Sequence, residues 1–170
     1  YVTSLAPGNY TLNVAAPGYQ TVTQTNQAVV AGTAYTKNVT LKVDLGSVII
    51  DCTPTTILAA ATSQCTATAR DSGGTNLPAS LQLAQNSYSW ASNNTSVATV
   101  DTSGKVTGKS AGTAGITASI SLDGSPAVIT SPAKTITVNP NVSITVKNTA
   151  GAGISDGDVL IRPLAHLAPR

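Results

Sequence analysis

Short stretches in which apolar residues alternate with threonine, serine or asparagine recur along the chain. In residues 65–69, for example, Cys65, Ala67 and Ala69 alternate with threonines. The same pattern occurs at residues 10–14, 39–43, 116–120 and 142–146. Because successive side chains of a strand point to opposite faces, this period of two predicts β-strands with one apolar face.

Glycine, proline, asparagine and aspartate separate these stretches, which is typical of strands joined by turns. Glutamate and methionine, both strong helix formers, are absent. Only residues 77–86, LPASLQLAQN, could hold a short turn of helix. One strand and turn occupy roughly eight to twelve residues, as in β-sandwiches. The sequence therefore predicts an all-β chain of β-sandwich domains.

The charge balance excludes several classes of partner. The 170 residues carry nine basic and seven acidic side chains, a net charge of +2, so neither nucleic acid nor an anionic membrane surface is an expected partner.

No apolar run approaches the ~20 residues of a membrane-spanning helix, and we expect no membrane insertion by this segment. The first residues do not resemble a signal sequence, so we expect the chain to begin inside a mature or larger protein.

Two changes in composition divide the chain into three expected segments, residues 1–46, 47–139 and 140–170. The first boundary precedes the apolar run SVII, and the second falls at the VNPNVS sequence around Pro140. Only the middle segment, of about ninety residues, is long enough to close a sandwich core alone. The outer segments are expected to be parts of domains.

Residues 101–115, DTSGKVTGKSAGTAG, contain a Gly-Lys-Ser triplet that suggests a phosphate-binding loop. That motif requires a glycine where this chain has Ser103, and a helix after Ser110. A glycine-rich, β-branched stretch follows Ser110 instead. We therefore interpret the glycines as turns between strands and place Lys105 and Lys109 on exposed turn and edge positions.

The middle segment contains an ordered set of motifs: Trp90, a polar run at residues 92–94, the Val97–Val100 strand, the turn and strand from Asp101 to Val106, and the Gly112–Ala118 strand. On these motifs it resembles the bacterial Ig-like group 2 domain. It implies a small Ig-like sandwich of the kind repeated in bacterial surface proteins such as intimin and invasin adhesins, and it brings no catalytic residues. The core is expected to contain Trp90, Val97, Val100, Val106 and Ile116.

Cys52 and Cys65 both lie in the middle segment. We predict a structural disulfide between them, which would contribute about 3 kcal/mol in the chain-entropy model. A metal site would need further ligands, and a redox pair favours C-x-x-C spacing; buried free thiols are the remaining alternative. A disulfide implies an oxidising location, extracellular or at the cell surface.

The first segment, residues 1–46, contains a turn and strand from Leu5 to Tyr10 and a Pro-Gly-Tyr motif at Pro17–Tyr19. On these motifs it resembles the C-terminal part of a carboxypeptidase regulatory-like, transthyretin-like domain. Residues 140–170 resemble its first strands, which would carry Val142, Ile144, Val146, Val159 and Ile161. Either the chain is a window on a longer tandem-repeat protein, or these C-terminal strands complete the N-terminal half-domain of the next subunit in a head-to-tail filament.

No catalytic, cofactor-binding or metal-binding residues are predicted. The single histidine, His166, has no visible partner, and Asp156 and Asp158 lack the further ligands of a Ca²⁺ loop. We predict a non-enzymatic structural module of an extracellular bacterial protein, a stalk, adhesin or filament subunit whose partners are neighbouring sandwich domains or identical subunits. The alternative is a carbohydrate-binding or accessory module of a secreted enzyme. Its ligands would be cell-surface or glycan ligands, with the tyrosines Tyr10, Tyr19 and Tyr88 as candidate contacts.

Overall fold

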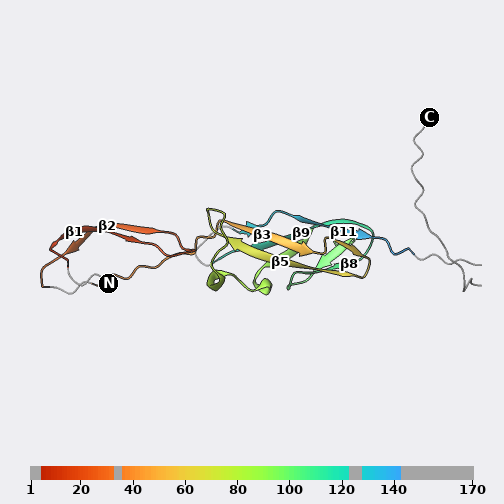
Figure 1. Ribbon diagram of the computed structural model, residues 1–170, viewed down its shortest axis with the longest axis horizontal. Helices are drawn as coiled ribbons and strands as arrows, with labels where there is room; N and C mark the ends of the chain where they lie inside the picture. The colour runs from red at the N-terminus through yellow and green to blue at the C-terminus, as the bar shows by residue number, and fades with distance from the viewer. Residues whose placement is uncertain (1–4, 33–35, 123–127, 143–170) are drawn as a thin grey trace, which may run out of the picture. The chain divides into compact units, whose positions relative to one another are not determined.

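The computed structural model describes residues 5–32, 36–122 and 128–142. The chain separates into two compact units, Tyr1–Pro140 and Asn141–Arg170. The described residues form β-strands and two single turns of 3-10 helix, so the prediction of an all-β chain is confirmed. The first unit contains both a β-hairpin and a β-sandwich, drawn in Figure 1. The expected three-part division of the chain remains a prediction.

The hairpin pairs β1 (Gly8–Val14) with β2 (Val22–Val29) in antiparallel register. The apolar residues of the 10–14 alternation lie on one face of β1, and the register shifts by one residue between Tyr10 and Leu12. Asn26 in β2 has a φ of 55°, which asparagine tolerates better than most residues. This irregularity is a β-bulge, and it keeps the apolar side chains of both strands on the same face.

The strand expected at residues 39–43 does not form. Only an isolated bridge joins Val43 to Tyr19, supported by hydrogen bonds from the Gln20 N–H to the Lys42 oxygen (2.8 Å) and from the Asp44 N–H to the Gly18 oxygen (2.9 Å). The alternation there is regular, but a ladder also needs a neighbouring strand, and within the described ranges none pairs with residues 36–42.

The first sheet of the sandwich has four antiparallel strands in the order β3-β5-β8-β7. They are β3 (Ser47–Thr53), β5 (Thr62–Arg70), β8 (Lys105–Gly108) and β7 (Ala98–Val100). The strand β3 pairs along its whole length with Gln64–Arg70 of β5, whereas β8 pairs only with Thr62–Gln64 of β5. Among the residues that the structure describes, no strand therefore pairs with this edge of β5 from Cys65 onward.

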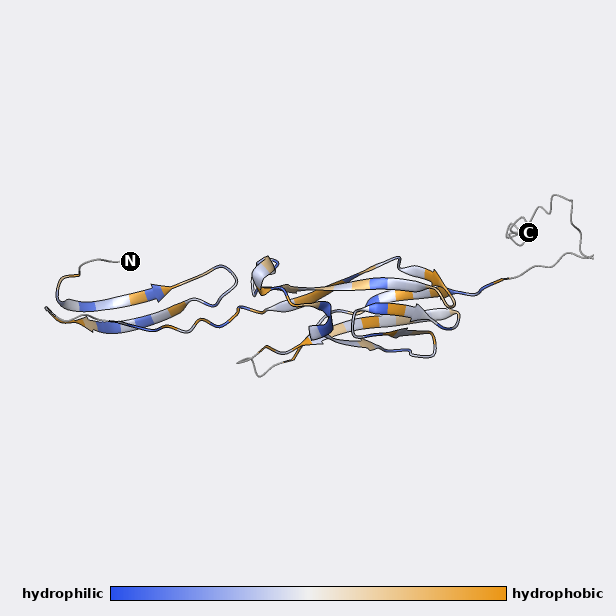
Figure 2. Cartoon of the chain, turned by 90° about the horizontal axis from the view of Figure 1, so that it is seen from below, coloured by the Kyte–Doolittle hydropathy of each residue, from blue (hydrophilic) through white to orange (hydrophobic). Residues whose placement is uncertain are grey.

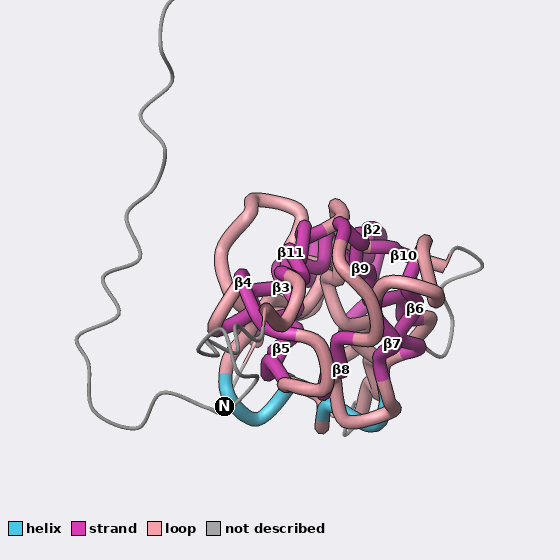
Figure 3. The backbone as a smooth tube through the Cα atoms, turned by 90° about the vertical axis from the view of Figure 1, so that its right-hand side faces the viewer, coloured by secondary structure: helices cyan, strands magenta, loops and turns pink. Residues whose placement is uncertain are grey.

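The second sheet is built around β9 (Gly112–Ile120). The strands β6 (Ser89–Ser92), β10 (Ile129–Thr130) and β11 (Lys134–Asn139) all pair with it in antiparallel fashion. On its other side β11 pairs in parallel with β4 (Thr56–Leu58). The chain thus changes sheets between β3 and β4, and Figure 3 shows β9 and β11 lying above β5 and β8.

The core lies between the two sheets, where the inward residues of each strand meet. One cluster gathers around Val106, Ile116 and Ile136, and a second around Val48, Tyr88 and Ile120. Trp90 is packed against both clusters and so joins them. Figure 2 shows hydrophobic segments alternating with hydrophilic ones along the strands. The period of two seen in the sequence is therefore the burial pattern of β5 and β9.

Candidate functional site

The stretch 101–115 forms a turn followed by strands. The Asp101 carboxylate accepts hydrogen bonds from the Ser103 N–H (2.8 Å), the Ser103 hydroxyl (2.7 Å) and the Lys105 N–H (3.0 Å). The Ser103 side-chain bond is the main cause that lowers the pKa of Asp101, followed by the Lys105 N–H bond. The carboxylate thus accepts these hydrogen bonds from within its own turn and stabilises it. Gly104 completes the turn with a φ of 79°.

Two glycines of this stretch are required by close packing. A Cβ on Gly104 would lie 2.5 Å from the Cys65 oxygen and 2.8 Å from a ring carbon of Trp90. A Cβ on Gly108 would lie 2.8 Å from the Leu58 oxygen. Both glycines are buried. They let the β8 backbone approach the core, which is a different use of glycine from cradling a phosphate.

The Gly-Lys-Ser triplet is also engaged within the fold. The Lys109 N–H donates to the Val97 oxygen at 2.7 Å, and the Ser110 hydroxyl donates to the Ser96 oxygen at 2.7 Å. The chain then enters β9 instead of a helix. The N-terminal helix geometry that holds phosphates is therefore not formed by these residues.

The residues expected in the core lie around one disulfide. Cys52 of β3 and Cys65 of β5 are direct partners in the antiparallel register and are joined, with a Cα–Cα distance of 4.0 Å. Val97, Val106 and Ile116 are buried beside them, whereas Val100 is half-buried against the same cluster. Trp90 is also partly buried, and its indole N–H donates to the Gln85 oxygen at 3.0 Å.

The open edge of β5 is covered by two glutamine side chains from the loop between β5 and β6. The Ala67 N–H donates to the Gln85 Oε1 (2.7 Å), and the Gln85 Nε2 donates back to the Ala67 oxygen (3.0 Å). Gln82 forms the same pair with Ala69, at 3.0 and 2.9 Å, and its Nε2 also donates to the Leu77 oxygen. Each side-chain amide therefore takes the place of a peptide unit of a missing strand.

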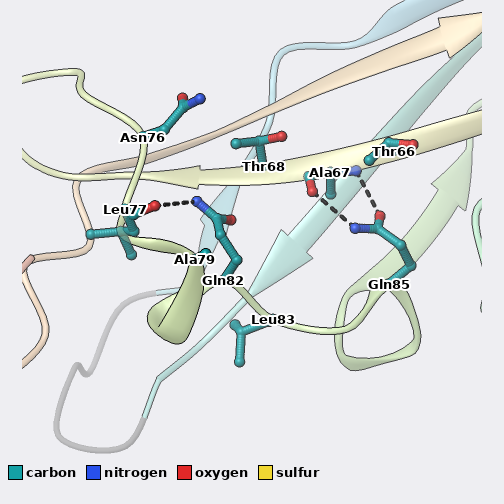
Figure 4. Close-up of a pocket in the computed structure, with 9 residues that line it drawn as sticks. All are labelled: Thr66, Ala67, Thr68, Asn76, Leu77, Ala79, Gln82, Leu83 and Gln85. Carbon is teal, nitrogen blue, oxygen red and sulfur yellow. Dashed lines mark hydrogen bonds between the residues drawn. The ribbon is translucent and has the colours of Figure 1, made fainter.

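Figure 4 shows the side chains of Gln82 and Gln85 directed at β5. Both side chains help to line a surface hollow of about 360 Å³. They belong to a loop that carries two single turns of 3-10 helix, η1 (Ala79–Leu81) and η2 (Gln85–Ser87), where the sequence allowed a short helical turn. Sequence reasoning missed both glutamines. No local signal marks them, because their role depends on where β8 stops pairing with β5.

A second hollow, of about 400 Å³, lies on the hairpin and is lined by Leu5, Tyr10, Leu12, Val29 and Lys37, with Thr11 and Gln27. Tyr10 and Tyr19 are half-buried, and Tyr88 is only 3% exposed. Tyr88 is therefore not available to stack on a glycan. Burial raises the pKa of its hydroxyl.

Other candidate residues from the sequence are less informative. Val142 is 76% exposed, while Ile144, Val146, Val159 and Ile161 lie outside the described residues, as do Asp156, Asp158 and His166. Within the described ranges, no three histidine, cysteine or acidic side chains cluster as metal ligands. In the same ranges, no helix has the length and apolar character needed to cross a bilayer.

A family model for the intimin immunoglobulin-like domain matches residues 84–121. The matched region includes β6, β7, β8 and β9, and thus Trp90 and the whole 101–115 stretch. No curated protein matches the chain. The match and the two-sheet fold together support an Ig-like domain in the chain. The finer resemblance to the group 2 family, and those of the outer segments to a carboxypeptidase regulatory-like domain, remain predictions.

Proposed function

We propose that the chain is a non-enzymatic structural module of an exported bacterial surface protein, one unit of a stalk or filament that carries tension along the polypeptide. The intimin-type match supports a surface protein. The Cys52–Cys65 disulfide supports an oxidising compartment outside the cytoplasm. The mechanical role rests on one observation, the parallel pairing of β4 with β11.

The parallel pairing of β4 with β11 means that the chain enters the sandwich at one end and leaves it at the opposite end. In the parallel register Thr137, Val138 and Asn139 oppose Thr56, Ile57 and Leu58. The chain enters the sandwich through β3, which leads into β4, and leaves it after β11, and Figure 1 shows β3 and β11 pointing the same way. A pull on the two ends of the sandwich therefore slides β4 and β11 past each other.

Sliding two paired strands is harder than peeling them apart. In shear, the hydrogen bonds and side-chain contacts between the strands must all yield together, whereas peeling breaks them one at a time. The Thr137 N–H donates to the Thr55 oxygen at 2.9 Å, and both Ile57 and Val138 are buried. We call this pair of strands the β4–β11 clamp.

Two further links hold the entering strand to the rest of the sandwich. The disulfide joins β3 to β5 immediately before the chain reaches β4. The Lys134 ammonium of β11 contacts the Asp51 carboxylate of β3 at 2.8 Å, between the two sheets. The hydrogen bond from Lys134, and then its charge, lower the pKa of Asp51. The pair is exposed, so its contribution to stability is small.

Single-molecule force spectroscopy on the full chain tests this proposal. Thr137→Pro removes the N–H that bonds to Thr55 and should lower the unfolding force strongly. Val100→Ala, which truncates a half-buried residue outside the clamp, is the control for general destabilisation. At equal equilibrium stability, we expect the Thr137→Pro variant to unfold at a clearly lower force than the Val100→Ala variant. Equal forces would reject a load-bearing role for the clamp.

We further propose that copies of the chain join head to tail by strand complementation. The hairpin supports this, because it is a two-stranded sheet whose apolar residues are only half-buried. Light scattering on the pure chain over a range of concentrations tests for such association, and a constant monomer mass would reject it.

A further inference from the structure

The apolar face of the hairpin is built from alternate residues of both strands. Tyr10, Leu12 and Val14 of β1 are paired in register with Gln27, Gln24 and Val22 of β2, and Val29 continues the same face. No described residue buries any of these side chains completely. The opposite face carries exposed asparagine and threonine side chains, so the two faces differ sharply in polarity.

The uncovered face has room for additional side chains. Its hollow of about 400 Å³ is far larger than the roughly 30 Å³ occupied by one water molecule. Leu5, at the rim, is 48% exposed. The Gln24 Oε1 is buried and has no hydrogen-bond partner within the part of the chain that the structure describes. A two-stranded sheet is marginally stable by itself, so this face needs a cover.

The C-terminal segment of the chain has the sequence of such a cover. Val142, Ile144 and Val146 alternate with polar residues over 141–147, which has the same length as β1, seven residues or about 23 Å when extended. Three apolar side chains at a spacing of two match the three of β1. Val142, the first of them, is 76% exposed. A second apolar run follows at residues 159–161.

Charge does not oppose this pairing. Residues 5–43 contain two lysines and no acidic residue, and one of the lysines, Lys37, lines the hollow. Residues 141–162 contain Lys147, Asp156, Asp158 and Arg162 and so carry no net charge. This segment therefore meets no net repulsion at the positively charged rim.

We propose that residues 141–147 and 157–162 of one copy form strands that cover the apolar face of β1 and β2 in a second copy. This inference rests on the proposed head-to-tail function and identifies the two surfaces that meet. The contact is heterologous, because the donor and acceptor surfaces differ, so each added copy leaves one of each exposed and the chain of subunits can grow.

Charge-matched variants of the full chain test the two surfaces separately. Leu12→Asp places a charge on the acceptor face, and Asn13→Asp places the same charge on the opposite face of β1. Ile144→Asp with Val146→Asp disrupts the donor residues, and Ser143→Asp with Thr145→Asp is its control. Light scattering should show assemblies for the wild type and both controls, and monomers for the other two proteins.

Mixing the two assembly-defective proteins gives the sharpest result. The Leu12→Asp protein keeps an intact donor, and the Ile144→Asp/Val146→Asp protein keeps an intact acceptor. Their mixture should form dimers of twice the monomer mass and nothing larger. A monomeric mixture, or the same loss of assembly in the controls, would overturn the proposal.

Hydrogen exchange provides a second measurement that does not depend on how well Leu12→Asp folds. Amides of the wild-type hairpin should gain protection as concentration rises, and unchanged protection would also overturn the proposal.

Force spectroscopy separates this inference from the mechanical role. Assembly of the wild type and of all four variants would reject only these docking surfaces, whereas a monomeric wild type would reject head-to-tail assembly itself. A low unfolding force in a wild type that assembles would reject only the mechanical role of the β4–β11 clamp.

Discussion

The side-chain amide of Gln85 pairs with the backbone of Ala67 as a neighbouring strand would, accepting from its N–H at 2.7 Å and donating to its oxygen at 3.0 Å. Ala67 is 4% exposed, so its peptide groups have little access to water. Gln82 repeats the arrangement at Ala69. These two amides close the part of the β5 edge that β8 leaves open.

Gln85→Ala should therefore lower the free energy of unfolding by about 2 kcal/mol, since it removes two hydrogen bonds and leaves buried backbone groups without partners. Asn86→Ala is the control, because Asn86 lies in the same 3-10 turn and is exposed. It should change stability by less than about 0.5 kcal/mol. Urea denaturation measures both, and equal effects would contradict the role given to Gln85.

A comparison of alanine substitutions at Gly104 and Gly74 separates the stability cost of backbone strain from the cost of close packing. Both have φ near 80°, but a Cβ would strike the Cys65 oxygen and Trp90 at Gly104 and would meet nothing within 4 Å at Gly74. Gly74→Ala should cost about 1 kcal/mol of stability, from the left-handed backbone alone. Gly104→Ala should cost about 3 kcal/mol or more. Similar losses for the two variants in thermal or urea unfolding would show that packing at Gly104 is loose.

Tyr88 carries a buried hydroxyl without a hydrogen-bond partner among the described residues. Tyr88→Phe should therefore raise the free energy of unfolding by about 1 kcal/mol, because it removes a desolvated polar group and keeps the ring. Tyr88→Ala, which empties the ring's place in the core, should destabilise the protein. A loss of stability in Tyr88→Phe would show that the hydroxyl has a partner.

The same residue predicts a dependence on alkaline pH. Burial raises the pKa of Tyr88 in the folded state, so above pH about 10 the unfolded chain loses this proton before the folded chain does. The contribution is fully present below that pH and is lost as pH rises toward the folded-state pKa. Stability should fall more steeply above pH 10 in the wild type than in Tyr88→Phe. Parallel curves from urea titrations would contradict the burial of the hydroxyl.

The disulfide should shorten the stretch of chain that a pull can extend. Cys52 and Cys65 are 13 residues apart in sequence but only 4.0 Å apart between Cα atoms. Reduction should therefore add about 40 Å of extended chain to the unfolding step. It should also lower the free energy of unfolding by about 3 kcal/mol. The doubly substituted Cys52→Ala/Cys65→Ala protein should extend as the reduced protein does, and an unchanged extension on reduction would contradict the intact bond.

The sequence predicts the sandwich well where burial has a local pattern. The alternation around Cys65 and Ile116 predicts strands, and those residues lie in β5 and β9. The equally regular alternation ending at Val43 does not form a strand. Alternation specifies which side chains share a face, but it does not specify a neighbouring strand to pair with.

The remaining features depend on contacts distant in sequence. The pairing of Leu58 with Asn139 joins a three-residue strand to a strand 81 residues later in the sequence, and nothing in either segment specifies this pairing. The role of Gln85 likewise follows from the point at which β8 stops pairing with β5. Such contacts are selected by the packing of the whole sandwich, so local periodicity could not reveal them.

The direction in which the β4–β11 clamp is loaded provides the most direct test of a load-bearing role. Force spectroscopy would pull one sample by the natural ends of the chain, and a second by handles on the exposed, paired residues Leu58 and Asn139, which peels the same two strands apart from one end. A clearly higher unfolding force along the natural direction is the predicted result. Equal forces in the two directions, or a lower force along the natural one, would contradict it.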